Sequence, residues 1–150
     1  MHESGLDAVQ LAQAIASGER SAREVLSASI DRVTTTDSRV NAFTDLTIDR
    51  ALAKADTIDA QRARGEQLPA LAGVPFAVKN LFDIAGLATR AGSKINRTRA
   101  PAQRDAFLVE QLETAGGVLL GALNMDEYAY GFTTENTHDG PCHNPHKLQH

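Results

Sequence analysis

The sequence has 150 residues, of which 42% are hydrophobic and 23% are charged, which is close to the average of globular proteins. A chain of this length buries roughly 70% of its extended surface, so it can form a core, and collagen, coiled-coil and mucin-like architectures are excluded. Fifteen Lys and Arg against nineteen Asp and Glu leave a formal net charge of -4. This charge argues against electrostatic capture of nucleic acid by the chain as a whole.

The first 66 residues predict helices. Ser4 and Asp7 can cap a first helix that ends at Gly18, and the spacing of residues 21–24 (Ser-Ala-Arg-Glu) predicts a capping box at the start of a second helix. Residues 34–37 (Thr-Thr-Thr-Asp) are expected to end that helix. The apolar residues with helical spacing are Val9, Leu11, Ala12 and Ile15 in the first helix and Val25, Leu26, Ile30 and Val33 in the second.

A short β-like piece at residues 41–44 precedes a third helix, which is expected from Ile48 to Arg64 and closed by Gly65. The apolar positions of this helix recur as Leu52, Ala55 and Ile58. Its many alanines and alternating charges are typical of a peripheral helix that covers a larger body.

The second part of the chain predicts an α/β unit. Residues 68–78 are almost wholly apolar and favour a buried strand, and Asp105 can cap a later helix that ends at Gly116–Gly117. Residues 118–120 form a second apolar strand, which is expected to end at Gly121. A strand, a long crossover, a helix and a strand in this order indicate parallel pairing.

Lys79 is the first charge after the apolar run, at a strand end, where open α/β sheets commonly bind ligands. In an apolar, partly dry site its amine would lose affinity for its proton and serve as a neutral base. The alternative is a structural lysine whose stem lies on apolar surface while its ammonium reaches water.

Residues 71–80 (Leu-Ala-Gly-Val-Pro-Phe-Ala-Val-Lys-Asn) resemble the lysine segment of the amidase-signature enzymes. Residues 124–127 (Asn-Met-Asp-Glu), Thr134–Asn136, Gly140–Pro141 and Asn144–Pro145 are similar to the stretch that leads to the family's serine motif. The resemblance implies an α/β fold with a mixed sheet flanked by helices. It also implies that residues 1–150 form the N-terminal part of one amidase domain, helical over 1–66 and α/β over 67–150.

By this resemblance Lys79 is the catalytic lysine, and its neutral amine takes the proton of a bridging serine that sits in a cis peptide. The bridging serine in turn activates a nucleophilic serine that attacks an amide carbonyl, without any cofactor. Thr133 and Thr134 lie near the expected pocket and are predicted to line the substrate channel.

The family's Gly- and Ser-rich motif is expected just beyond Asn144–His146, but this sequence continues with residues 147–150 (Lys-Leu-Gln-His). Only one serine, Ser93, follows Lys79, and in the resemblance it belongs to a loop. We therefore expect this chain to be inactive by itself, as a fragment or a truncated product that is partly molten or aggregation-prone alone.

Residues 78–83 and 91–98 most resemble the 1-carboxybiuret hydrolases of s-triazine breakdown, whereas many other relatives have Asp where Asn80 stands. A small carboxylated amide is the implied substrate, and ammonia the product. Two other possibilities stay open: a non-catalytic remnant or partner-binding fragment, and a protein similar to the A subunit of tRNA-dependent amidotransferases. Full-length relatives are commonly homodimers or bind small accessory subunits.

Three further features have structural interpretations. The His and Cys residues near the end of the chain match no common zinc spacing, so no metal site is expected. The side chains of the adjacent acids Asp126 and Glu127 are expected to point in different directions on a helix. We expect Asn124 or Asp126 to cap the turn after the strand and Glu127 to join a buried polar network. The basic run 94–99, with Arg90 and Arg104, is interpreted as a solvated loop rather than an anion site. The His and Cys residues concerned are His138, Cys142, His143, His146 and His150.

Cys142 is the single cysteine, so no internal disulfide can form. The first residues carry an early acid and no apolar stretch of signal-peptide length, and no run of 18 apolar residues occurs anywhere. A cytoplasmic protein that does not enter a membrane is therefore expected.

Overall fold

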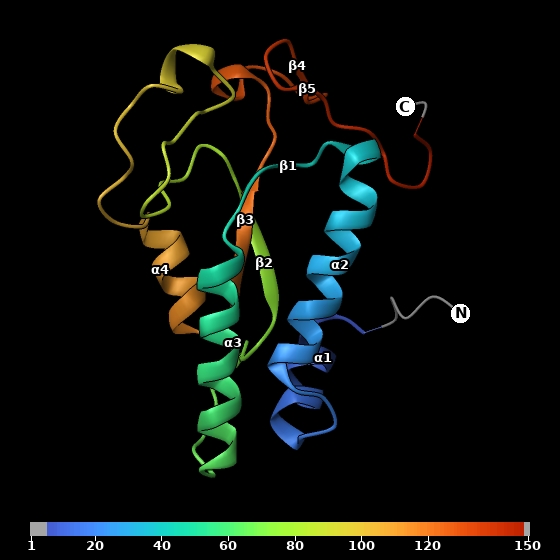
Figure 1. Ribbon diagram of the computed structural model, residues 1–150, viewed down its shortest axis with the longest axis vertical. Coiled ribbons are helices and arrows are strands. Elements are labelled where there is room, and N and C mark those ends of the chain that lie inside the picture. Colours follow the sequence, from blue (N-terminus) through green and yellow to red (C-terminus); the bar gives the residue numbers. More distant parts are fainter. Residues whose placement is uncertain (1–5, 149–150) are drawn as a thin grey trace. The chain divides into compact units, whose positions relative to one another are not determined.

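The computed structural model describes residues 6–148. Figure 1 shows the order of the elements along the chain. The α-helices are α1 (Ala8–Ser17), α2 (Ala22–Val40), α3 (Ile48–Ala63) and α4 (Phe107–Thr114). The strands are β1 (Phe43–Leu46), β2 (Pro75–Lys79), β3 (Val118–Leu123), β4 (Glu135–Asn136) and β5 (Gly140–Pro141), and the short 3-10 helices are η1 (Lys94–Asn96) and η2 (Glu127–Ala129).

The described chain divides into two compact units, each built from separate segments of the sequence. The first unit comprises the residues up to 31, residues 47–76 and residues 111–120, and the second comprises residues 32–46, 77–110 and those from 121 onward. The first unit buries Ile15, Leu26, Ala51, Ala55, Ile58, Val118 and Leu119. The second buries Val78, Ile84, Val109, Ala122 and Met125.

The main sheet has three strands in the order β1-β3-β2. Strand β1 runs antiparallel to β3. Val118 donates to the carbonyl of Val74, and Asn80 donates to that of Leu123, both at 2.9 Å. Residue numbers thus rise in the same direction along β2 and β3, which confirms the predicted parallel pairing and makes the sheet mixed.

The predicted starts of the first two helices are confirmed. Asp7 is the N-cap of α1 and forms a capping box with Gln10, while the expected cap Ser4 lies outside the described residues. At the start of α2, Ser21 and Glu24 exchange side-chain-to-backbone hydrogen bonds of 2.9 and 3.0 Å. Within residues 6–148 no helix has both the length and the apolar character that crossing a lipid bilayer requires.

The predicted end of the second helix is wrong, because α2 continues to Val40 rather than stopping at residues 34–37. The hydroxyls of Thr35 and Thr36 donate to the carbonyl of Arg32 inside the helix, so their polar groups are satisfied without ending it. The Asp37 carboxylate accepts the backbone N–H groups of Ala42 and Phe43 beyond the helix. Residue 37 therefore organises the exit from the helix instead of terminating it.

Both apolar runs in the second part of the chain also differ from the prediction. Of residues 68–78 only those from Pro75 onward are extended, because Ala72 donates to Pro69 and Val74 to Leu71 in successive turns. Strand β3 does not stop at Gly121 but continues to Leu123. A β-carbon at position 121 would lie 2.2 Å from the Asp45 carbonyl oxygen, so glycine here permits close strand pairing rather than a turn.

Candidate active site

Lys79 is the last residue of β2 and is exposed. Its carbonyl accepts the N–H groups of Leu81 at 2.7 Å and Phe82 at 3.1 Å, so the chain turns directly after the lysine. The structure thus places the amine at a strand end, as the sequence predicts. The apolar, dry surroundings that favour a neutral amine are not present around it in the part of the chain that the structure describes.

Asn80, directly after the lysine, is only 3% exposed. Its side-chain amide donates to the Thr44 hydroxyl and, at 3.3 Å, to the Asp45 carboxylate, while its Oδ1 accepts the backbone N–H of Arg90 at 2.9 Å. The Arg90 guanidinium closes the group by an ion pair of 2.6 Å to Asp45. The turn after Lys79 is therefore tied both to β1 and to the loop that begins at residue 90.

That loop continues through Gly92, where the backbone φ is +66°. The buried Asn136 amide donates to the carbonyls of Gly92 and Met125, each at 2.7 Å, and its Oδ1 accepts the N–H groups of His138 and Asp139. All hydrogen-bonding groups of this amide are thereby used. Asn136 connects the loop after β2 with the segment after β3.

Ser93 is 1% exposed, and its hydroxyl donates to Oε1 of Glu127. The same oxygen lies 3.4 Å from Nε2 of His138. The Ser93 hydrogen bond is the largest effect and lowers the pKa of Glu127; desolvation opposes it to a smaller extent, and His138 lowers the pKa further. Glu127 joins a polar network, as expected, but the prediction that it is buried there is wrong, because this residue is exposed.

The acid before it, Asp126, is 8% exposed and has a structural role. Its two carboxylate oxygens accept the N–H groups of Thr134 at 3.1 Å and Glu135 at 3.2 Å. Asn124 accepts the N–H of Met125 at 2.8 Å, so both of the expected turn-capping residues after β3 bind backbone N–H groups. These bonds hold the segment that carries the predicted substrate-lining threonines.

Thr133 is exposed, and its hydroxyl donates to Glu135 at 3.2 Å. Thr134 is half-buried with a φ of +54°, a left-handed conformation that is rare for a β-branched residue. Its carbonyl accepts the N–H of Cys142 at 2.9 Å. The role of both threonines in lining a substrate channel stays a prediction.

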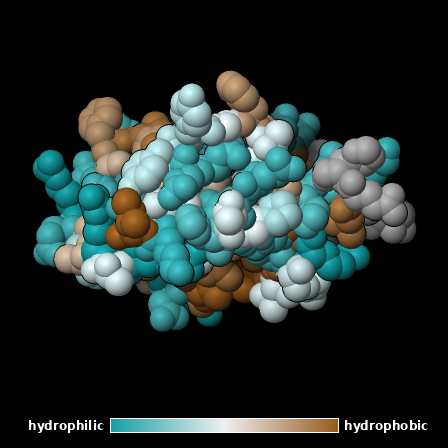
Figure 2. Space-filling model, turned by 90° about the horizontal axis from the view of Figure 1, so that it is seen from above, coloured by the Kyte–Doolittle hydropathy of each residue, from teal (hydrophilic) through white to brown (hydrophobic). Residues whose placement is uncertain are grey.

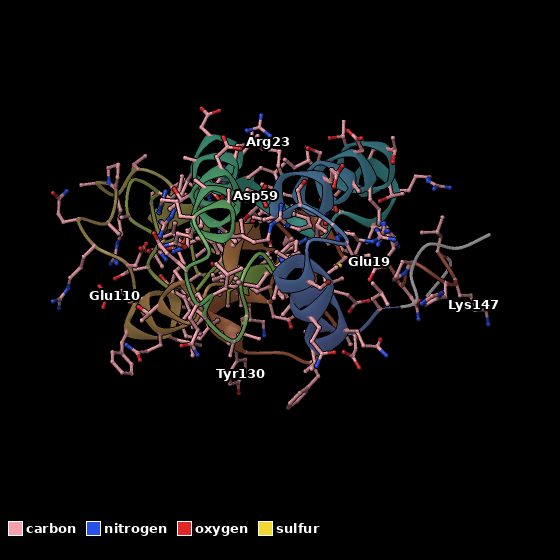
Figure 3. All side chains as sticks on the ribbon, turned by 90° about the horizontal axis from the view of Figure 1, so that it is seen from below. Glu19, Arg23, Asp59, Glu110, Tyr130 and Lys147 are labelled. Atoms are coloured by element: carbon pink, nitrogen blue, oxygen red, sulfur yellow. The ribbon has the colours of Figure 1, made fainter. Side chains whose placement is uncertain are left out.

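A cavity of about 480 Å³ lies beside this segment, lined by residues 126–128, Tyr130 and residues 135–137. Tyr130 is 97% exposed and extends away from the ribbon in Figure 3. Exposed apolar side chains also interrupt the otherwise mainly hydrophilic face shown in Figure 2. The cavity is therefore open and bordered by aromatic surface.

The structure also bears on two further interpretations from the sequence, which concern metal binding and the basic segment. Among residues 6–148 no group of three or more His, Cys, Asp or Glu side chains is arranged to hold a metal ion, and His150 lies outside that range. The basic segment is not simply solvated, because Arg97 pairs with Asp139 and Arg90 with Asp45. These arginines join segments that are distant in the sequence, which a charge count along the chain does not show.

Sequence reasoning missed two residues that organise this region, Asp45 and Asn136. Asp45 follows the predicted β-like piece directly, and its position opposite Asn80 depends on the pairing of β1 with β3. In the sequence, Asn136 stands out only as part of the motif Thr134–Asn136. No pattern along the sequence distinguishes a buried, fully bonded asparagine from an exposed one.

Comparison with known proteins agrees with this arrangement. The family model for amidases matches residues 24–150. The subunit AtzE of 1-carboxybiuret hydrolase from Pseudomonas sp. (strain ADP) is 62% identical over 92% of this chain. The A subunit of glutamyl-tRNA(Gln) amidotransferase from Salinispora arenicola (strain CNS-205) is 46% identical over 97% of it.

Solved structures show the same likeness. A vestigial protein complex described as revealing the evolutionary origins of an s-triazine catabolic enzyme matches 95% of this chain with a TM-score of 0.94 and 59% identity. The native peptide amidase from Stenotrophomonas maltophilia matches 98% with a TM-score of 0.86 and 28% identity. The chain spans about 30% of the length of these relatives. With most of its residues matched by the family model and its fold shared with these enzymes, the chain belongs to the amidase family, the amidase-signature enzymes.

Proposed function

We propose that this chain carries the catalytic lysine of an amidohydrolase that hydrolyses a small carboxylated amide, such as 1-carboxybiuret, and releases ammonia. The main support is the 62% identity to the 1-carboxybiuret hydrolase subunit AtzE over 92% of the chain. The position of Lys79, at the end of a strand of the shared fold, is consistent with that role. Identity to the amidotransferase A subunits is lower, at 46%.

In the proposed mechanism the neutral amine of Lys79 accepts the proton of a bridging serine, which accepts that of a nucleophilic serine. The serine oxygen then forms a bond to the amide carbonyl carbon, and the C–N bond breaks as the nitrogen regains a proton and leaves as ammonia. Water hydrolyses the resulting ester. Thr133 and Thr134 line the substrate channel in this proposal.

In this proposal residues 1–150 form the N-terminal part of one amidase domain, helical over 1–66 and α/β over 67–150. The two relay serines then lie outside this chain, which is inactive by itself. In this proposal the apolar surroundings of the Lys79 amine come from the serine-bearing part of the enzyme, because the lysine is exposed in this chain. The working enzyme is cytoplasmic, and it is a homodimer or binds a small accessory subunit.

Complementation tests the proposal. The 150-residue chain is mixed with the serine-bearing remainder of AtzE, and ammonia release from 1-carboxybiuret is measured. We expect none from the chain alone, release from the mixture, and loss of release with Lys79→Ala. Lys54→Ala, which removes a half-buried lysine of α3, serves as the matched control and keeps the activity.

The N-terminal segment of AtzE mixed with the same remainder shows that the assay works. Ammonia release by the chain alone, or by the mixture carrying Lys79→Ala, contradicts the proposed relay. Failure of the mixture while the AtzE segment succeeds contradicts the assignment as a whole. Release from glutamine in place of 1-carboxybiuret supports an amidotransferase-like protein.

A further inference from the structure

The side chains of Asn80 and Asp45 face each other beneath the turn that follows Lys79. The Nδ2 of Asn80 lies 3.3 Å from Oδ2 of Asp45 and also donates to the Thr44 hydroxyl. The other carboxylate oxygen of Asp45 is held by Arg90 at 2.6 Å. The amide of residue 80 therefore meets only acceptors on this side, and a hydrogen-bond donor is required there.

The opposite side of Asn80 is equally constrained. Its Oδ1 accepts the N–H of Arg90 at 2.9 Å, its carbonyl accepts the N–H of Ala91 at 2.7 Å, and its N–H donates to Leu123 at 2.9 Å. The residue is 3% exposed, so water cannot replace a lost partner. Because Lys79 is its covalent neighbour, any shift of Asn80 changes the direction of the lysine side chain.

We propose that Asn80 is a positioning residue for Lys79 and that the Asp45 carboxylate requires an amide at position 80. The two side chains form an amide–carboxylate pair whose members can exchange places. The inference rests on the proposed function for the role of the lysine, but the pair itself does not. Asp at position 80 would set two carboxylates 3.3 Å apart with a single guanidinium to neutralise both. With Asp at position 80, Asn at position 45 would restore a hydrogen-bond donor between the two side chains, and its oxygen would still accept from Arg90.

The test is a double-mutant cycle with two readouts. In the 150-residue chain, Asn80→Asp should accelerate hydrogen exchange of the Arg90 and Ala91 amides at least about tenfold, because their acceptors shift. Asp45→Asn combined with Asn80→Asp should return both rates to near the wild-type values. Asn80→Ala lacks any side-chain acceptor for Arg90 and should not be rescued by Asp45→Asn.

Asn96→Asp provides the specificity control. Asn96 is 2% exposed and donates to the Arg90 carbonyl and the Tyr128 hydroxyl, so it is another buried asparagine near the same loop. Any damage caused by Asn96→Asp should not be repaired by Asp45→Asn. If the Asn96 variant is repaired equally, the effect at Asn80 is general and the pair is refuted.

The second readout is ammonia release after complementation. Asn80→Asp should lower kcat at least about tenfold with little change in KM, and the exchanged pair should restore kcat. If the double variant restores the hydrogen-exchange rates but not kcat, the positioning role is overturned. If the double variant does not restore the hydrogen-exchange rates, the pair itself is overturned. If the wild-type mixture fails to release ammonia, the proposed function and the positioning role fail together, while the exchange data still decide whether the pair exists.

Discussion

The side-chain amide of Asn136 donates to the backbone carbonyl of Gly92 at 2.7 Å and so joins the loop after β2 to the segment after β3. Both residues are buried. The same amide satisfies the Met125 carbonyl and two backbone N–H groups. One side chain therefore ties the Gly92 loop to the segment after β3 through four hydrogen bonds.

Asn136→Ala should lower the free energy of unfolding by about 2–3 kcal/mol, because it leaves buried carbonyls without donors. Asn144→Ala is the matched control, since the side chain of this exposed asparagine accepts only the N–H of His146 in the described chain, at 2.9 Å. Urea unfolding measures both. Equal losses in the two variants would show that the buried amide has no special importance.

Gly92→Ala should cost about 2–4 kcal/mol, combining left-handed strain with overpacking. A β-carbon there would lie 2.8 Å from both the Asn136 Nδ2 and the Met125 carbonyl oxygen. Gly86→Ala separates the two effects, because φ is +87° at that position and nothing lies within 4 Å of the added carbon. The control should lose only the strain, about 1–2 kcal/mol, and a loss as large as that of Gly92→Ala would argue against the steric explanation.

Glu127 should titrate below its ordinary pKa of 4.5, chiefly because the Ser93 hydroxyl donates to its ionised form. Since the folded-state pKa is the lower one, the interaction stabilises the fold above the ordinary pKa and is lost as the pH falls through the lowered value. Ser93→Ala should move the pKa of Glu127 back upward. Carbon NMR of the carboxyl group measures the change, and an unchanged titration in the variant would remove Ser93 as its cause.

Arg62→Met should destabilise the first unit by about 1.5–3 kcal/mol. Its guanidinium donates to the carbonyls of Ile15 at 3.0 Å and Arg20 at 2.7 Å, around the C-terminal end of α1. Arg64→Met is the control, because within residues 6–148 that exposed side chain pairs only with Glu66, and it should show no measurable change in urea unfolding. Destabilisation by both variants alike would point to a general loss of positive charge.

The sequence alone predicts the features that depend on neighbouring residues. The Asp7 cap of α1, the capping box of α2, the extent of α3 and the turn at Gly116 follow from local hydrogen bonding and from backbone freedom within a few positions. The motifs around Lys79 likewise indicate the family, because their residues are adjacent in the chain. Parallel pairing of β2 and β3 follows from the order of the elements.

The extents of α2 and β3, and the partners of the polar residues, are decided only by the tertiary structure. Gly121 is typical of a turn when considered locally, but it lies inside a strand because Asp45 packs against it. Asn80, Asp45 and Arg90 meet across gaps of 35 and 45 residues, and Asn136 reaches Gly92 across 44. Hydrogen bonds between such distant residues form only in the folded chain, so no local pattern can specify them.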